Sequence, residues 1–421
     1  MSPPDTARRA ALSLIVGVLE GRQTLAEQAA PLEPLPAPER ARAQRLAATT
    51  LRHLSRADAM LRPHLRKPPP ADVLALLRLA TVELCALGEA PHGVVHAAVA
   101  LVKSGGVAGA PFGPLVNAVL RKVAADLPRW DRLDPPALPG WLRGRLMSAY
   151  GKAATMRIEA AHLAGAPIDL SVMENPALWA ERLGARLLPT GSLRLAAGVH
   201  LTELPGYASG DWWVQDAAAA LAVKLLAPQP GEQVLDLCAA PGGKTLQLAA
   251  AGAQVTAVDL SESRMGRLHE NLARCGLGAT CLCADALVWQ PQGKFDAILL
   301  DAPCSATGTI RRHPELPFVK DATGLKELVA LQSALIDRAL GWLKPGGRLV
   351  FATCSLLPEE GEAQIAAALA RHPGLGLQPA EIAGQSPDWR GAGGALRLRP
   401  DFWPEVGGMD GFFLARLGFQ P

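Results

Sequence analysis

The first 130 residues carry apolar side chains at helical spacing. Gly and Pro clusters at 67–70, 88–93 and 104–114 interrupt the pattern. It predicts helices over 5–20, 38–54, 71–87, 91–103 and 113–127. We therefore expect an all-helical bundle at the amino terminus.

From residue 215 onward the pattern alternates between short apolar runs and amphipathic stretches. The short runs predict strands at 233–237, 254–260, 279–284, 295–300 and 348–353. Helices are expected between and beside them, at 216–226, 244–251, 261–275, 324–343 and 359–371. Strands that alternate with helices indicate a doubly wound, mainly parallel sheet.

The region between these two parts is harder to interpret. Residues 130–140 are typical of a linker, and a helix is expected at 141–150. Strands at 168–173 and 192–201 around a helix at 176–183 suggest a small α/β subdomain. The predicted domains are therefore 1–135, 141–208 and 209–421.

Composition adds three constraints. A chain of 421 residues with 49% hydrophobic residues can build more than one core. The net charge is +3, and residues 1–140 hold more basic than acidic side chains. That excess suits a polyanion, although an Arg-rich solvated surface explains it equally well. Seven cysteines without tandem spacing indicate free thiols, and no apolar run approaches the roughly 18 residues that span a bilayer, so we expect a cytoplasmic protein.

The segment LDLCAAPGGKT (235–245) has the order strand, glycine-rich turn, helix start, which lets backbone amides approach a ligand. A P-loop is excluded because Cys238 stands where its first glycine belongs, and a dinucleotide fingerprint needs more glycines. Asp236, Asp259 and Asp285 each lie at or just after the end of a predicted strand. Each aspartate alone could be a helix cap. Together with the turn they match the arrangement seen in S-adenosylmethionine methyltransferases.

Two cysteines follow predicted strands in the same way. Cys304 lies in DAPCSATGT (301–309) and Cys354 in FATCS (351–355). Because a parallel sheet delivers its strand ends to one edge, both thiols could face one substrate, which indicates covalent chemistry. Buried cysteines are also common apolar fillers. We assign that role to Cys85, Cys275, Cys281 and Cys283, since a C-x-C pair alone is a weak metal signal.

Four motifs in the carboxyl-terminal half together resemble the Sun/Fmu (RsmB-type) RNA cytosine-5 methyltransferases. They are LDLCAAPGGKT, AVDLSESR, FDAILLDAPCSATGT and FATCSLLPEEGE. The stretches VVHAAVALVK (94–103) and PLVNAVLRKV (114–123) are similar to the NusB-like RNA-binding domain of that branch. The resemblance implies an all-α NusB-like bundle, a small α/β subdomain and a Rossmann-like methyltransferase domain. It also implies S-adenosylmethionine as cofactor, a cytidine in 16S ribosomal RNA as substrate, a monomer, and no metal.

The resemblance also implies residue roles, because chemistry alone does not choose between the two thiols. Cys354 would attack the base and Cys304 would assist product release. Asp301 would bind the Watson–Crick edge of the cytosine, with Lys244 nearby. The cofactor would be held by Cys238, Ala239, Ala240, Pro241, Gly242, Gly243, Lys244, Asp259, Asp285 and Asp301.

RNA contacts are expected at two places. Arg121 and Lys122 lie on the exposed side of the last helix of the bundle, and Arg311 and Arg312 follow the Pro-Cys motif, where they could hold flanking phosphates. Without the resemblance, an ordinary solvated face is the better explanation for Arg121 and Lys122. For Arg311 and Arg312, an ordinary exposed loop explains the sequence equally well. Two other functions remain open, a transfer-RNA cytosine-5 methyltransferase and a non-catalytic RNA-binding factor.

Overall fold

The computed structural model describes residues 6–104, 110–196 and 198–420, and the chain forms two compact units. One unit comprises Met1–Ala164 together with Ile310–Ala322, and we call it the helical unit. The other comprises Gly165–Thr309 and Thr323–Pro421, and we call it the sheet unit.

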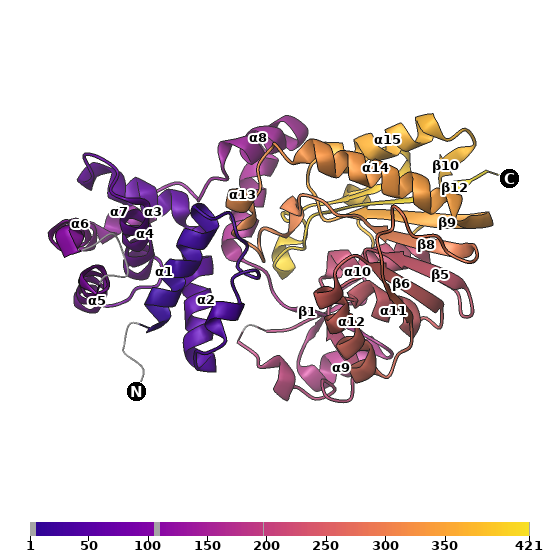
Figure 1. The fold of residues 1–421 in the computed structure, drawn as a ribbon, viewed down its shortest axis with the longest axis horizontal. Helices are drawn as coiled ribbons and strands as arrows, with labels where there is room; N and C mark the ends of the chain where they lie inside the picture. The colour runs from indigo at the N-terminus through magenta and orange to yellow at the C-terminus, as the bar shows by residue number, and fades with distance from the viewer. Residues whose placement is uncertain (1–5, 105–109, 197, 421) are drawn as a thin grey trace. The chain divides into compact units, whose positions relative to one another are not determined.

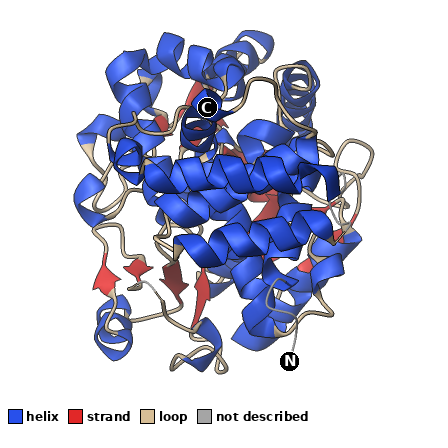
Figure 2. Ribbon diagram, turned by 90° about the vertical axis from the view of Figure 1, so that its left-hand side faces the viewer, coloured by secondary structure: helices blue, strands red, loops and turns tan. Residues whose placement is uncertain are grey.

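The helical unit is built around one long buried helix, and Figure 2, which faces this unit, shows it almost wholly as helix. Helix α4 (Ala71–Cys85) buries most of its side chains, and its only buried carboxylate, Glu83, accepts a hydrogen bond from Arg8 at 2.7 Å. The bundle confirms the predicted all-α class. The other α-helices within the described residues up to Ala164 are α1 (Thr6–Leu19), α2 (Ala37–Arg52), α3 (Leu54–Leu61), α5 (Pro91–Lys103), α6 (Gly113–Ala125), α7 (Leu127–Asp131) and α8 (Gly140–Ala164) (Figure 1).

Helix boundaries differ from the expectation at two places. The stretch predicted as one helix over 38–54 breaks at His53, where a new helix, α3, starts on its own axis. The helix predicted over 141–150 ends at Gly151, whose φ of 79° is not helical, and a further helical stretch then runs to Ala164. Position 5 lies outside the described residues.

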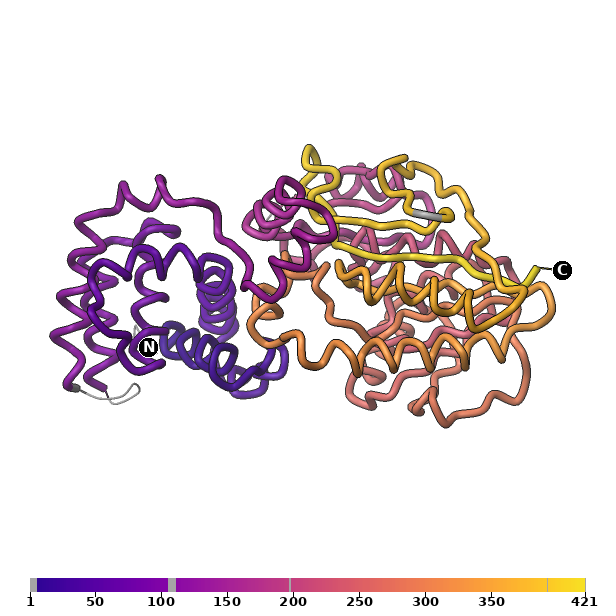
Figure 3. The backbone as a smooth tube through the Cα atoms, turned by 90° about the horizontal axis from the view of Figure 1, so that it is seen from above, coloured from indigo at the N-terminus to yellow at the C-terminus, as the bar shows by residue number. Residues whose placement is uncertain are grey.

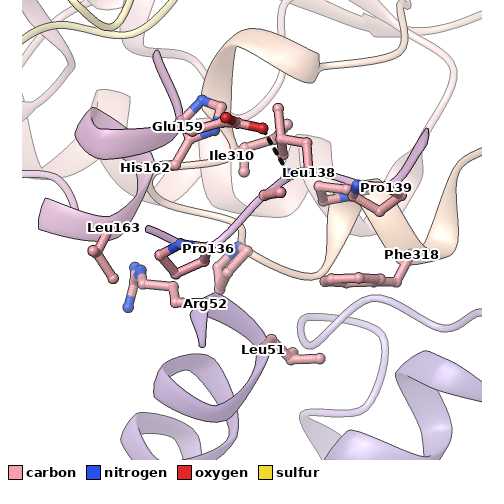
Figure 4. A pocket seen from close by; sticks show the side chains of 13 residues that line it. Leu51, Arg52, Pro136, Leu138, Pro139, Glu159, His162, Leu163, Ile310 and Phe318 are labelled. Carbon is pink, nitrogen blue, oxygen red and sulfur yellow. Dashed lines mark hydrogen bonds between the residues drawn. The ribbon is translucent and has the colours of Figure 1, made fainter. Parts of the chain in front are cut away.

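Residues 310–322 belong to the helical unit although their chain neighbours belong to the sheet unit (Figure 3, orange). The Arg52 guanidinium donates to the Arg311 carbonyl at 2.9 Å, and the indole of Trp141 donates to the Pro317 carbonyl at 3.0 Å. The short helix α13 (Leu316–Val319) lies in this segment. A small cavity of about 40 Å³ separates Ile310 and Phe318 from α2 and α8 (Figure 4). The predicted boundaries of 1–135 and 141–208 therefore differ from the observed units, because α8 and residues 310–322 both pack in the helical unit.

The sheet unit begins with a small antiparallel sheet, in the order β2 (Arg186–Leu187), β3 (Leu193–Arg194), β1 (Asp169–Val172) and β4 (Trp212–Val214). Helix α9 (Pro176–Leu183) has the predicted bounds. Arg194 donates to both oxygens of the buried Asp169, at 2.6 and 2.8 Å, and the same carboxylate accepts from the backbone of Ala217 at 3.1 Å. This ion pair joins the small sheet to the start of α10 (Ala217–Leu226).

The large sheet has a parallel core of five strands, in the order β9 (Leu343–Thr353), β8 (Phe295–Asp301), β5 (Gln233–Leu237), β6 (Gln254–Asp259) and β7 (Thr280–Cys283). Beyond β9 lie three antiparallel strands that the pattern did not predict, β12 (Phe412–Phe419), β10 (Leu375–Leu377) and β11 (Leu396–Leu398). The Rossmann-like class is confirmed.

Helices cover both faces of the large sheet. The face that carries Leu235, Ile298 and Leu349 packs against α14 (Leu325–Gly341) and α15 (Glu362–Arg371). The opposite face, with Val234, Leu299 and Val350, packs against α10. Helices α11 (Gly243–Ala250) and α12 (Glu262–Cys275) complete that layer. No helix among the described residues is long and apolar enough to cross a membrane.

Candidate active site

The two cysteines predicted to face one substrate lie next to each other. Strands β8 and β9 are adjacent and parallel, and Asp301 pairs in register with Ala352, so both chains leave the sheet at the same level. The sulfur atoms of Cys304 and Cys354 are 3.4 Å apart. Neighbouring strand ends thus bring together two thiols that are fifty residues apart in sequence.

The environment of Cys304 keeps its thiol protonated. Its hydrogen bond with Cys354, its burial and the negative charge of Glu360 raise the pKa of Cys304 well above the ordinary thiol value. The thiolate is the nucleophilic form of cysteine. A protonated Cys304 thiol thus lies in contact with the Cys354 sulfur.

A partly buried ion pair lies close to the thiols. The Lys244 ammonium donates to the Asp301 carboxylate at 2.7 Å and lies 5.5 Å from the centre of the Phe412 ring. Burial opposes the charged form, but the charge and hydrogen bond of Asp301 outweigh it and raise the pKa of Lys244. The ammonium also interacts electrostatically with Cys354. Lys244 therefore stays charged beside the candidate nucleophile.

The glycine-rich turn is held in a conformation that needs its particular residues. Gly242 has a φ of 105°, and a Cβ at this position would lie 2.9 Å from the Leu268 side chain. Asp259 accepts a hydrogen bond from the backbone of Ala240 at 3.0 Å and another from Ser261 at 2.9 Å. The predicted Asp259 thus anchors the turn directly.

Cys238, which starts the turn, is not a reactive thiol. Burial and the charges of Asp301 and Asp259 raise its pKa to about 12. The side chain packs against the core of the sheet unit. Cys238 lines the pocket beside this turn, and its backbone role there stays a prediction.

A pocket of about 180 Å³ opens beside this turn. Asp236 lies at its base, where Oδ2 accepts from the Thr245 hydroxyl at 2.6 Å and the buried Oδ1 has no partner among the described residues. Burial raises the pKa of Asp236 to about 7. An unpartnered buried acceptor fits a ligand that brings its own donor, as the amino group of S-adenosylmethionine would. The lining residues are Val214, Gln215, Asp216, Ala219, Asp236, Cys238, Ala239, Ala240, Pro241, Gly243, Lys244 and Asp301.

Asp285, predicted as a cofactor contact, is exposed and does not line this pocket. Its carboxylate accepts from the backbone of Leu287 at 2.8 Å, so it also caps a turn. Leu260, directly after Asp259, is 72% exposed. An exposed leucine beside the end of β6 offers an apolar surface to a flat ring, and the pattern analysis overlooked it.

Four further residues of the site region were missed. Thr245 contacts Asp236, and Phe412 contacts Lys244. Gln215 lines the pocket, and Glu360 contacts the cysteine loops. Thr245 and Glu360 lie within motifs that had been singled out, so their side-chain chemistry was a usable signal. Phe412 lies on β12, far along the chain, and only the antiparallel pairing brings it to Lys244.

The predicted RNA contacts divide into two groups. Arg121 and Lys122 are exposed on α6, and Arg121 lines a groove of about 320 Å³ with His92, His96 and Asn117. Arg311 has no exposed surface, because residues 310–322 pack within the helical unit. The phosphate contact predicted for Arg311 does not fit this burial and is not retained, and Arg312 is half-buried.

Metal coordination has no support in the part of the chain that the structure describes, where no group of three His, Cys, Asp or Glu side chains could hold an ion. Cys281 and Cys283 lie on β7, and the Cys283 thiol contacts the Leu260 carbonyl at 3.5 Å. All seven cysteines are free thiols.

Comparison with known proteins gives the same picture along the whole chain. Residues 223–418 match the family described as 16S rRNA methyltransferase RsmB/F, and residues 5–125 match the NusB family. The ribosomal RNA small subunit methyltransferase B of Salmonella arizonae is 35% identical over 99% of both chains, and that of Vibrio cholerae is 38% identical over 77% of both. The solved structure of PH0851 superposes with a TM-score of 0.76 at 25% identity over 99% of both chains. The chain therefore belongs to the RsmB/F family of 16S rRNA methyltransferases.

Proposed function

We propose that this chain transfers a methyl group from S-adenosylmethionine to carbon 5 of a cytidine in 16S ribosomal RNA, through a transient bond between Cys354 and the base. The observation that carries the proposal is the pair of sulfur atoms 3.4 Å apart, beside the Lys244–Asp301 ion pair. The family membership supports the substrate class.

Carbon 5 of cytosine is a weak nucleophile and needs activation. The thiolate of Cys354 adds to carbon 6, and the electrons of the 5,6 double bond move to carbon 5, which becomes able to attack an electrophile. S-adenosylmethionine supplies the electrophilic methyl group when it is bound. Solvent accepts the carbon-5 proton, the electrons of that carbon–hydrogen bond restore the 5,6 double bond, and the carbon–sulfur electrons return to Cys354 as the thiolate leaves.

The two thiols take different roles. We assign the attack to Cys354 because the resemblance of its Thr-Cys motif to the family implies that role. We assign Cys304 to the release step, since its sulfur lies within contact distance of the sulfur that must leave. Covalent catalysis of this kind separates one difficult step into two easier ones.

Asp301 and Lys244 act on the base rather than on the sulfur. The Asp301 carboxylate is partly exposed and held by Lys244, so it can accept a hydrogen bond from the Watson–Crick edge of the cytosine. This contact favours the protonated ring and stabilises the adduct. The target base must leave its stack to reach this site, at a cost of a few kcal/mol.

The chain's own residues would hold the cofactor in the pocket beside the glycine-rich turn. The unpartnered Asp236 Oδ1 would accept from the amino group, and the turn from Cys238 to Lys244 would contact the ligand through its backbone. We assign Asp259 to the ribose, and Leu260 and Asp285 to the adenine. We propose a monomer, as the resemblance implies, and a ribosomal RNA substrate leads us to expect that it acts in the cytoplasm.

The decisive experiment is bisulfite sequencing of 16S ribosomal RNA and transfer RNA after incubation with the purified full-length protein and S-adenosylmethionine. We expect one protected cytidine in 16S ribosomal RNA. Protection in transfer RNA alone would favour the transfer-RNA methyltransferase. Cofactor binding without any protected cytidine would leave a non-catalytic RNA-binding factor as the better account.

A further inference from the structure

A fully buried carboxylate lies between the two cysteine loops. Glu360 ends the short helix η6 (Pro358–Glu360), six residues after Cys354, and has no exposed surface. Each cysteine is followed by a serine, Ser305 after Cys304 and Ser355 after Cys354, and both serines contact this carboxylate. Burying a charged group is costly unless hydrogen bonds satisfy it.

Four donors converge on the two oxygens of Glu360. Oε1 accepts from the backbone of Ser305 at 2.8 Å and from the Gln332 amide at 3.0 Å. Oε2 accepts from the hydroxyls of Ser305 and Ser355, each at 2.5 Å. An ionised carboxylate only accepts hydrogen bonds, so it suits such a site, whereas the amide of glutamine would turn a donor toward some of these donors.

The same contacts fix the two loops against each other. The Thr307 hydroxyl accepts from the backbone of Leu356 at 2.9 Å, and the backbone of Gly308 donates to the Cys354 carbonyl at 2.9 Å. The Thr353 hydroxyl donates to the Glu360 carbonyl at 3.0 Å. The Thr307 hydroxyl lies 3.3 Å from each serine hydroxyl, whereas Glu360 accepts from both at 2.5 Å and also receives the Gln332 amide from α14.

We propose that Glu360 is a positioning residue that holds Cys304 and Cys354 in register through Ser305 and Ser355. The inference rests on the proposed function, because it concerns the two thiols of that mechanism. Glu360 has no exposed surface with which to touch the base or the methyl donor. It acts from behind the thiols, through the geometry of the loops and through its charge, which raises the pKa of Cys304. A misplacement of about 1 Å in a reacting group can reduce a rate roughly 100-fold, so the carboxylate is expected to affect turnover far more than binding.

The test compares Glu360→Gln with the full-length wild type. We expect kcat to fall about 100-fold, while KM for the RNA and the Kd for S-adenosylmethionine stay within about twofold. Glu232→Gln is the matched control, since Glu232 also carries several hydrogen bonds, to Arg348 and Gln229, but lies next to the first residue of β5, at the opposite edge of the sheet. Its kcat should match the wild type.

A second readout needs no RNA. Diamide takes two electrons and two protons from a pair of thiols and leaves a disulfide, and the rate depends on how close the two sulfurs are held. We expect disulfide formation between Cys304 and Cys354, measured by mass spectrometry, to slow about tenfold in Glu360→Gln and to be unchanged in Glu232→Gln. If the wild type does not methylate RNA, the proposed function fails, while this measurement still tests Glu360.

Ser355→Ala guards against a folding defect in the glutamine variant. It removes a single hydroxyl and leaves Glu360 with three donors, so kcat should fall by a smaller factor, about tenfold, with KM unchanged. The inference is overturned if Glu360→Gln turns over within twofold of the wild type. It is equally overturned if Glu360→Gln and Ser355→Ala lose cofactor binding and kcat in parallel.

Discussion

At the scale of single residues, the structure separates two cysteines that look equivalent in the sequence. Both follow an apolar strand, and both are followed by serine. Only in three dimensions does Cys304 have a raised pKa, from its hydrogen bond with Cys354, its burial and Glu360. The raised pKa of Cys304 arises from its surroundings and not from the motif around it.

Substitution of each thiol should therefore have a different outcome. Cys354→Ala removes the attacking sulfur, and methyl transfer should fall at least 1,000-fold, to background, because the activating bond cannot form. Cys304→Ala should still allow transfer but leave the chain attached to the RNA. The readouts are methyl incorporation and an RNA-linked band on a denaturing gel.

Cys283→Ala provides the control for this pair, since that thiol is exposed on β7 and contacts only a backbone carbonyl. It should turn over normally and leave no adduct. Normal turnover by Cys354→Ala would contradict the assignment, and a gel-stable adduct in that variant would exchange the roles of the two cysteines.

The sequence allowed the role of a motif residue to be predicted where its contact partners lie in the same motif or in a neighbouring one. The turn, its aspartate anchor Asp259 and the two thiols were all singled out correctly as neighbours of one site. Glu360 was quoted as part of a motif without a role, because nothing in the sequence shows that its side chain turns inward. The burial of Arg311 was not predictable either, since the residue lies in a short Arg-rich stretch with no periodicity.

At the scale of elements, the parallel core follows from its hydrophobic runs, and strand β5 has the predicted bounds. Such runs are buried on both faces, which makes them legible. The antiparallel strands β10, β11 and β12 were missed because they lie in a Gly- and Pro-rich region without alternation. These strands pair with strands that are distant in the sequence, and the local hydrophobic pattern does not show which strands will pair.

The Asp169–Arg194 pair gives a test at this scale, because it joins β1 and β3 to α10. Both side chains are buried, so Asp169→Ala leaves an unpaired guanidinium and should lower the free energy of unfolding of the sheet unit by about 3–5 kcal/mol. The measurement is urea unfolding followed by the fluorescence of the buried Trp212 and Trp213 on β4.

Asp337→Ala is the matched comparison. Asp337 contacts Arg371 at 2.8 Å and His372 at 2.7 Å, but its side chain is 40% exposed, and pairs that water reaches contribute only about 0–1 kcal/mol. A small, equal effect of both substitutions would show that the buried pair contributes no more to stability than the exposed one.

At the scale of the whole molecule, two kinds of architecture share one chain. The helical unit and the sheet unit were each expected from periodicity, and both classes are confirmed. The packing of residues 310–322 in the helical unit was not expected, because this segment has neither helical nor strand periodicity. The buried residues of the segment include the apolar Ile310, Leu316 and Pro317, but they do not form a continuous apolar run.

The helical unit should bind RNA through α6. Reversing the charge of Arg121 and Lys122 to Glu in the full chain should weaken RNA affinity and lower the slope of log affinity against log salt by about 2, while cofactor affinity is unchanged. Arg371→Glu with Arg390→Glu changes net charge equally and is the control. Equal loss in both double variants would mean that only overall charge matters.

The helical unit should also lose stability in acid through His162. This side chain lines the cavity in Figure 4, and neither ring nitrogen has a partner among the described residues. Burial and the charges of Arg311 and Arg52 lower its pKa to about 3. The unfolded chain binds a proton near pH 6.5, so stability is present above that pH and is lost as the pH falls toward 3.

His162→Phe removes this titration. Between pH 6.5 and 4, its unfolding free energy should depend less steeply on pH than that of the wild type, by up to about 1.4 kcal/mol per pH unit. Hydrogen exchange in α8, measured at pH 6.5, 5.5 and 4.5, reports the difference. Identical slopes in the two proteins would assign the acid sensitivity to other groups.

The position of residues 310–322 in the helical unit affects when this unit can finish folding during translation. A ribosome releases residues 1–164 early, yet the last piece of that bundle, 310–322, follows only after residues 165–309 have been synthesised. At roughly 5–20 residues per second this interval is about 7–30 s. During this interval the nascent bundle exposes the apolar surface that Ile310 and Leu316 later cover. We therefore expect a chaperone to bind the chain mainly at this stage of translation.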